Sequence, residues 1–175
     1  MAAPSTLFRF RLSIASAPTP IDIRVAQHPS ETLIFLITRV LAYALNYQVG
    51  IEFGAGLAEP DAPAIRVIGN HGQILKWIDI GNPSPRRLHK SAKAAGSVSV
   101  YTYKDVERLK KEAQGEKIYN AHKIQIFAVN ADFLENLAVL LERDNHWELA
   151  MSGEVLEVTI KGEVYEALLE RHSLS

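Results

Sequence analysis

The sequence of residues 74–101 is ILKWIDIGNPSPRRLHKSAKAAGSVSVY, and it carries the signals of a strand, a helix and a second strand in succession. Ile74 to Ile80 is rich in the apolar residues that strands favour. Residues 81–85 (GNPSP) break the chain, and a helix is predicted from about Ser84 to Ala95. The next strand starts at residues 98–101. This alternation predicts an α/β arrangement with helices packed on the faces of a sheet.

Further predicted elements extend the pattern towards both ends of the chain. Period-two alternation of apolar and polar residues predicts strands at 8–14 and 21–25, which pair as a hairpin. A largely apolar helix is predicted up to Asn46, with Ser30 as its N-cap. The remaining predictions are strands at 51–53, 65–68, 124–129, 147–151, 155–160 and 164–168, and helices at 104–114 and 132–143. The sequence therefore predicts a central mixed sheet flanked by helices, with additional N- and C-terminal hairpins, in a single domain of residues 1–175.

The composition excludes several classes of protein. With 47% hydrophobic and 22% charged residues the chain resembles an ordinary globular protein, which excludes global disorder. The absence of cysteine excludes disulfides, zinc ribbons, iron–sulfur clusters and thiol nucleophiles. No apolar run approaches the roughly 18 residues of a membrane-spanning helix, and the N-terminus lacks the pattern of a signal peptide. We therefore expect a cytoplasmic protein that does not associate with membranes.

The charge is unevenly distributed along the chain. The net charge is only -1, yet residues 84–123 contain ten Lys or Arg and four Asp or Glu, a local balance of +6. Such a segment suits contact with the phosphate groups of a partner. An ordinary solvent-exposed helix face is the alternative interpretation. Both interpretations stay open at the level of the sequence.

A set of carboxylates at structural junctions is the main candidate for chemistry, because the chain has no Gly-rich phosphate loop and no nucleophile elbow. Glu31 lies at the predicted helix start, Glu59 and Asp61 lie in a turn before a strand, and Asp79 lies within a strand. An ionised carboxylate is costly to bury without a partner, which makes Asp79 notable among apolar neighbours. Two or three such groups converging would bind Mg²⁺, and metal-held water could then attack a phosphodiester.

Each of these acids also has a purely structural interpretation. Glu31 suits the positive end of a helix dipole, and acids such as Asp61 are common in turns. Asp79 has Arg86 and Lys90 just downstream as candidate ion-pair partners. The residues alone therefore leave a metal site and a set of structural acids as open alternatives.

The sequence resembles the YaeQ family of bacterial proteins in a series of blocks between Leu7 and Tyr103. These blocks are His28–Thr32, Arg39–Tyr43, Phe53–Leu57, Glu59–Ala64, Trp77–Gly81, Arg86–Lys90 and Tyr101–Tyr103. The first block and the Trp-Ile-acid-x-Gly block are together the most specific. The remainder of the chain resembles the family through its strand pattern.

The YaeQ family is similar in fold to the PD-(D/E)XK, or restriction-endonuclease-like, superfamily. The resemblance implies a central mixed sheet flanked by helices and an acidic site that binds Mg²⁺, with Mn²⁺ as an alternative. It implies that Glu31 matches the helix acid that superfamily members often add, and that Asp79 matches the acid of the third core strand. Asp61, or its neighbour Glu59, would match the acid before the second core strand.

The lysine of the superfamily pattern is the point at which this sequence departs from it. The resemblance implies a lysine two positions after Asp79, and this sequence has Gly81 there. Lys90 in the following helix is the candidate to supply the missing cation, with Lys93 as the second choice. Arg86, Arg87 and Lys93 would then contact the phosphate backbone of DNA or RNA.

Two functions follow from these expectations. The first is a Mg²⁺-dependent nuclease or related phosphodiesterase, in which Glu31, Asp61 and Asp79 hold the metal and Lys90 stabilises developing negative charge. The second is a catalytically inactive nuclease-fold protein that acts as a nucleic-acid- or protein-binding module. Gly81 in place of the usual lysine favours the second function.

Overall fold

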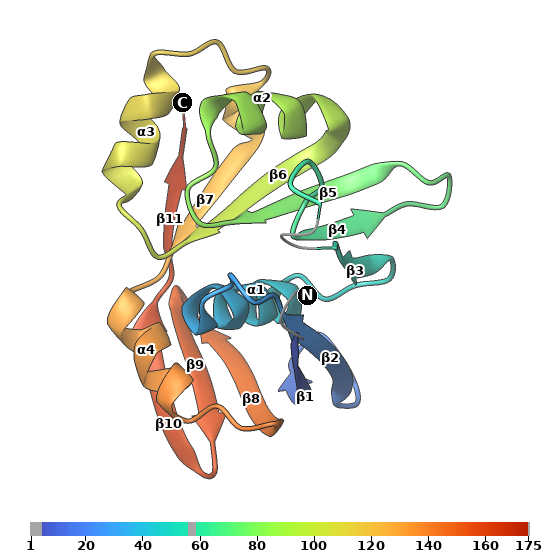
Figure 1. Cartoon of the computed structure of the whole chain (residues 1–175), viewed down its shortest axis with the longest axis vertical. Helices are drawn as coiled ribbons and strands as arrows, with labels where there is room; N and C mark the ends of the chain where they lie inside the picture. The colour runs from blue at the N-terminus through green and yellow to red at the C-terminus, as the bar shows by residue number, and fades with distance from the viewer. Residues whose placement is uncertain (1–4, 56–58, 175) are drawn as a thin grey trace. The chain divides into compact units, whose positions relative to one another are not determined.

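The structure of the chain is a computed structural model that describes residues 5–55 and 59–174. It divides into two compact units (Figure 1), of which unit 1 comprises Met1–Tyr47 and Asn130–Leu169, and unit 2 comprises Gln48–Val129 and Glu170–Ser175. Each unit has one mixed sheet and two α-helices within the described residues, so the predicted mixed α/β fold is confirmed. The strands form two sheets, however, and not the one central sheet that we predicted. The single domain over residues 1–175 stays a prediction.

Unit 1 contains a five-stranded sheet in the order β10-β9-β8-β1-β2. Its strands are β1 (Thr6–Ile14), β2 (Ile21–Gln27), β8 (Asp144–Ser152), β9 (Val155–Ile160) and β10 (Glu163–Leu168). β1 pairs antiparallel with β2, which confirms the predicted N-terminal hairpin, and parallel with β8. In Figure 1 the blue strands β1 and β2 therefore lie in one sheet with the orange-red strands β8 to β10.

Two helices, α1 (Leu33–Leu45) and α4 (Ala131–Val139), pack against each other in unit 1. Phe10 and Trp147 are among the buried, inward-facing residues of this sheet. Their rings meet edge to face at a centroid distance of 5.1 Å. This packing follows from the period-two alternation of β1, since every second side chain points into the core.

No helix of the described residues is long and apolar enough to cross a membrane.

The start of α1 differs from the prediction. Thr32, and not Ser30, is the N-cap, and its Oγ1 accepts a hydrogen bond from the backbone N–H of Phe35 at 3.2 Å. The Oγ of Ser30 lies instead 2.8 Å from Nδ1 of His28. Glu31 consequently directly precedes the N-cap and does not lie in the first turn of the helix.

Removing the observed cap should therefore destabilise the protein more than removing the predicted one. We expect Thr32→Ala to lower the free energy of unfolding by about 1 kcal/mol, because the N–H of Phe35 loses its acceptor. Ser30→Ala is the matched control and should cost no more than about 0.5 kcal/mol, as an exposed substitution. Urea unfolding of both variants measures the difference, and equal costs would contradict the assigned cap.

Unit 2 contains a six-stranded sheet in the order β11-β7-β6-β5-β4-β3. Its strands are β3 (Ile51–Phe53), β4 (Ile65–Ile68), β5 (Ile74–Ile80), β6 (Ala95–Thr102), β7 (Ile124–Ala128) and β11 (Glu170–Ser173). β5, β6 and β7 run parallel, and β4 and β11 flank them in antiparallel pairing. Helices α2 (Pro85–Ala94) and α3 (Val106–Gln114), with the short 3-10 helix η2 (Ala121–Lys123), make the connections between the parallel strands.

Both α2 and α3 cover the same face of the unit 2 sheet. Leu88 of α2 and Leu109 of α3 are buried in one cluster with Val98 and Val100 of β6. Parallel pairing places Asp79 of β5 in register with Val100. Residues that are partners across two strands lie on the same face of the sheet, so Asp79 shares the helix-covered face with Val100. The fold thus places an acid beneath α2.

Candidate functional site

Asp79 is buried against the first turn of α2 and paired there with Arg87. The side chain of Asp79 is only 4% exposed. Nε of Arg87 donates to Oδ2 of Asp79 at 2.8 Å, and Nη2 donates to Oδ1 at 2.9 Å. Ser84 caps α2 by accepting from the backbone N–H of Arg87 at 3.2 Å, which fixes the start of the arginine side chain. The result is a two-bond contact of the strongest geometry that an arginine makes with a carboxylate.

The same guanidinium group also binds the turn before β4. Nη2 of Arg87 donates to the carbonyl oxygen of Ala62 at 2.6 Å, and Nη1 donates to the carbonyl oxygen of Pro60. Four oxygens, namely Oδ1 and Oδ2 of Asp79 and these two carbonyl oxygens, thus face one cation, and we call them the oxygen cradle. The guanidinium also lies 5.8 Å from the ring centroid of Trp77. Hydrogen bonding to Asp79 raises the pKa of Arg87, so the cation is permanent.

Asp61 and Lys90 form a second, exposed pair beside the oxygen cradle. Nζ of Lys90 lies 3.5 Å from Oδ1 of Asp61, and the two side chains are 52% and 95% exposed. Such a solvated pair contributes little to stability. The charge of Asp61 also acts on Arg87, so Asp61 and Asp79 attract the same cation. Glu59, the alternative to Asp61, is exposed.

Glu31 is paired with an arginine in unit 1. Nε of Arg39, from the middle of α1, donates to Oε2 of Glu31 at 3.1 Å, and Nη2 donates to Oε1 at 3.0 Å. The backbone N–H of His28 donates to Oε1 at 3.1 Å, and Nη2 of Arg39 also reaches the carbonyl oxygen of Ala26. The side chains of Arg39 and Glu31 are only 7% and 2% exposed. The pair fastens the segment before α1 to the helix itself.

Burial dominates the electrostatics of this pair. It raises the pKa of the Glu31 carboxyl above its usual value, and the charge of Arg39 offsets part of that effect. It also lowers the pKa of Arg39, which the charge of Glu31 partly restores. Each charge therefore stabilises the other in the buried site, and removing either residue would leave an unpaired buried charge.

The structure brings together three of the four residues predicted for catalysis. Asp61, Asp79 and Lys90 lie within unit 2, whereas Glu31 belongs to unit 1. The partner of Asp79 is Arg87, and not Arg86 or Lys90, the two candidates that the sequence suggests. The described part of the chain contains no group of three His, Cys, Asp or Glu residues that could hold a metal ion.

The oxygen cradle has the donor chemistry of a divalent-cation site but is filled by a side chain. Hard carboxylate and carbonyl oxygens are the ligands that Mg²⁺ prefers. Both oxygens of Asp79 are occupied by Arg87, and a metal ion beside them would be repelled by the guanidinium. These residues therefore do not fit a metal ion in the arrangement observed.

All the charged residues on the outward face of α2 are basic. Arg86, Lys90 and Lys93 are exposed and follow one another at helical spacing, and the helix contains no acidic residue. Arg87, predicted to contact nucleic acid, is directed to Asp79 instead. Unit 2 as a whole has thirteen Lys or Arg and nine Asp or Glu, a net charge of +4, whereas unit 1 has six and eleven, a net charge of -5.

The pairing of Arg39 and Arg87 with the buried acids was not predicted from the sequence, although a signal was present for each. Arg39 interrupts the otherwise apolar run of α1, and a charged residue in a buried helix requires a partner. Arg87 precedes the buried Leu88 and lies one turn before the buried Ser91, so helical spacing turns it inwards. Arg86, one position earlier, is exposed.

A family model and several curated proteins match the sequence of this chain. A sequence model of the family described as YaeQ protein matches residues 1–168. The chain is 29% identical over 107 residues to a protein described as "Uncharacterized protein YaeQ" from Escherichia coli (strain K12), and 28% identical to its counterpart from Salmonella typhi. Each alignment covers 59% of this chain and 59% of the relative, so the chain matches less than two thirds of the length of these curated relatives.

Comparison with solved structures extends the similarity to nearly the whole chain. The crystal structure of YaeQ protein from Pseudomonas syringae superimposes with a TM-score of 0.84 at 26% identity, covering 98% of this chain and 96% of that one. The crystal structure of YaeQ protein from Xanthomonas axonopodis pv. citri gives a TM-score of 0.87 at 24% identity, covering 97% and 98%. The second similarity, at its lower identity, concerns the fold alone.

Proposed function

Because the chain belongs to the YaeQ family, whose curated relatives are described as uncharacterized, we propose its function from its own geometry. We propose a catalytically inactive protein of nuclease-like fold that binds the phosphate backbone of nucleic acid. In this proposal α2 provides the contact surface, and Arg87 holds the acidic site in a form that does not recruit a metal ion.

The orientation of the side chains of α2 is the observation that carries the proposal. Arg87 turns inwards and fills the oxygen cradle, so that each carboxylate oxygen of Asp79 already accepts a hydrogen bond from the guanidinium cation. Arg86, Lys90 and Lys93 turn outwards and have no acid on their own helix. One helix thus neutralises the acids beneath it and presents cations to the solvent.

Nucleic acid fits this surface better than an acidic protein does, because the contact is a short row of cations without apolar anchors. Protein interfaces usually depend on buried aromatic or apolar residues at their centre, and the exposed face of α2 offers Arg86, Lys90 and Lys93. Phosphate contacts of this kind are independent of sequence and are weakened by salt, since binding releases counterions. The +4 charge of unit 2 favours the same partner.

The salt dependence of binding tests this proposal. With three phosphate contacts, the slope of log K against log[salt] should be about -2 to -3. We expect Arg86→Gln and Lys93→Gln each to reduce that slope by about 1. The measurement is the fluorescence anisotropy of labelled single- and double-stranded DNA and RNA, titrated in the presence of EDTA.

The matched control is Lys161→Gln, which removes an exposed cation of unit 1 and should leave the slope unchanged. Wild-type protein that binds none of these nucleic acids would contradict the proposal, as would an unchanged slope in the Arg86→Gln/Lys93→Gln variant. Either result would direct the search towards a protein partner.

A Mg²⁺-dependent nuclease or phosphodiesterase is the second candidate function. It is favoured by one observation, the proximity of Asp61, Asp79 and Lys90 within unit 2. Arg87 would have to leave Asp79 before Mg²⁺ or Mn²⁺ could occupy the oxygen cradle. Cleavage of DNA or RNA by the wild type in either metal, lost in Asp79→Ala, would support this candidate over the first.

A further inference from the structure

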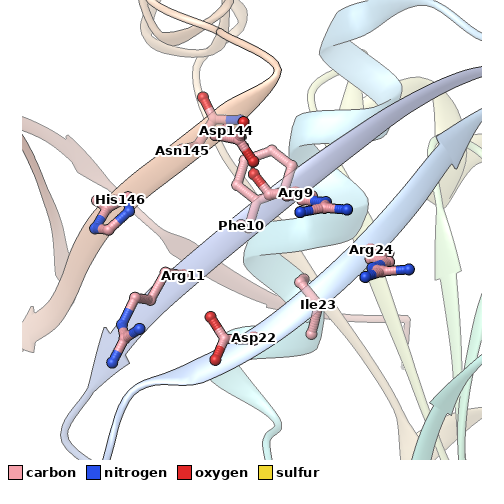
Figure 2. Close-up of a pocket in the computed structure, with 9 residues that line it drawn as sticks. All are labelled: Arg9, Phe10, Arg11, Asp22, Ile23, Arg24, Asp144, Asn145 and His146. Atoms are coloured by element: carbon pink, nitrogen blue, oxygen red, sulfur yellow. Dashed lines mark hydrogen bonds between the residues drawn. The ribbon is translucent and has the colours of Figure 1, made fainter.

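A hollow of about 330 Å³ lies on the sheet of unit 1, and none of the acids and arginines of the candidate site lines it (Figure 2). It is lined by three neighbouring strands: Arg9, Phe10 and Arg11 of β1, Asp22, Ile23 and Arg24 of β2, and Asp144, Asn145 and His146 of β8. The strand pattern places every second one of these residues on the exposed face. The charged residues of the hollow therefore share one side of the sheet.

Two of the arginines stand directly opposite each other. Arg9 of β1 is the cross-strand partner of Arg24 of β2, and Figure 2 shows their guanidinium groups directed the same way. Like charges in directly opposite positions destabilise a sheet. Arg11 lies two residues along β1 from Arg9 and opposite Asp22, so it adds a third cation at the next position of the same face.

These arginines also differ from several others in the protein in what they bind. Arg39, Arg66, Arg87 and Arg108 each form an ion pair with a carboxylate. Within the described residues no ion pair involves Arg9, Arg11 or Arg24, although Asp22 and Asp144 line the same hollow. Three exposed guanidinium groups with unused donors, two of them repelling each other, form a surface that an anion would stabilise.

We propose that this hollow binds the pyrophosphate group of a small phosphorylated molecule. Arg9 and Arg24 would each donate two hydrogen bonds to phosphate oxygens, as the planar guanidinium fork allows. A pyrophosphate group carries enough charge to offset the repulsion between two adjacent cations, and its two phosphates suit a pair of opposed forks. The volume of the hollow lies near the lower end of the range for small-ligand pockets, which fits a compact ligand.

The acids of the hollow limit where the anion can lie. Asp22 is opposite Arg11, and Asp144 is the partner of Arg9 on the β8 side. Arg24 has neither acid as its cross-strand partner, since it is paired with Arg9, and its strand β2 ends the order of the sheet. We therefore place the phosphate contact at the Arg9–Arg24 pair and make Arg24 the residue whose loss should weaken binding most.

The test uses inorganic pyrophosphate and a nucleoside diphosphate as separate probes in calorimetric titrations. We expect saturable binding of at least one probe to the wild type, weakened about tenfold or more in Arg24→Gln through the loss of charge-assisted hydrogen bonds. Binding of both probes would show that the pyrophosphate group alone is sufficient for recognition. Binding of the nucleoside diphosphate alone would assign the nucleoside as part of the recognised ligand.

Thermal unfolding without ligand supplies a second readout on the same variant. Removal of the Arg9–Arg24 repulsion should leave the midpoint of Arg24→Gln equal to or above that of the wild type. The added stability from pyrophosphate should then be present in the wild type and in the matched control Arg108→Gln, and absent in Arg24→Gln. Failure of both probes to bind the wild type, or equal affinity in Arg24→Gln, would overturn the proposal.

Discussion

Arg87→Ala is expected to lower the free energy of unfolding by about 3–5 kcal/mol at neutral pH, the usual cost of breaking a buried ion pair from one side. The reason is that the carboxylate of Asp79, only 4% exposed, would lose both hydrogen bonds from the guanidinium and be left buried without a cation. The carbonyl oxygens of Pro60 and Ala62 would lose their donors at the same time. Urea unfolding at neutral pH measures the cost.

Two further variants separate the buried charge from other effects of the substitution. Arg86→Ala removes an exposed arginine from the same turn of α2 and should change the stability by no more than about 0.5 kcal/mol. Asp79→Asn in the Arg87→Ala background should recover part of the loss, because it removes the uncompensated charge. If Arg87→Ala costs no more than Arg86→Ala, the pair does not hold α2 and β5 together.

Arg39→Met is expected to have a cost of similar size, about 3–5 kcal/mol at neutral pH, because it leaves the carboxylate of Glu31 buried without its cation. Methionine keeps most of the apolar stem of the arginine, so packing is largely retained. The backbone N–H of His28 would then be the remaining described donor to Oε1 of Glu31.

The cost of Arg39→Met should depend on pH with a definite sign. Burial raises the pKa of Glu31, and the charge of Arg39 opposes that shift, so the pKa rises further when Arg39 is lost. The folded variant then holds the proton of Glu31 more tightly than the unfolded chain does. Its deficit against the wild type should be smallest below the usual pKa of a glutamate and should grow as the pH rises through the raised pKa of Glu31.

The double variant Glu31→Gln/Arg39→Met serves as the control for this pH dependence. It has no titrating group at position 31, so its stability relative to the wild type should lack the growing deficit that Arg39→Met shows. Urea unfolding at a series of pH values measures both variants. A deficit of Arg39→Met that is constant over this range would show that the charge of Glu31 is not the cause.

Local patterns of the sequence predicted most elements of the fold. Period-two alternation identified β1 and β2, and Gly-Asn-Pro-Ser-Pro placed the break between β5 and α2. β11, by contrast, was missed, because Glu170 to Ser173 has no alternation and forms a strand only by pairing with β7. The two-sheet arrangement also depends on a distant pairing, that of β1 with β8, which no local pattern specifies.

The candidate site was predicted in its acids but not in their partners. Asp79 was recognised because a carboxylate among apolar neighbours needs compensation, and the structure supplies it. The sequence suggested Arg86 or Lys90 as the partner of Asp79, and the position of the helix over the sheet selects Arg87 instead. Glu31 and Arg39 lie eight residues apart, and the irregular segment before α1 brings them together.

A calorimetric titration of Mg²⁺ and Mn²⁺ into the wild type and Asp79→Asn tests the central claim most directly, namely that Arg87 keeps the oxygen cradle from binding a metal ion. We predict the same heats for both proteins, because both oxygens of Asp79 are already occupied by Arg87 in the wild type. A saturable isotherm for the wild type that Asp79→Asn abolishes would contradict the claim and restore the metal-dependent nuclease as the leading function.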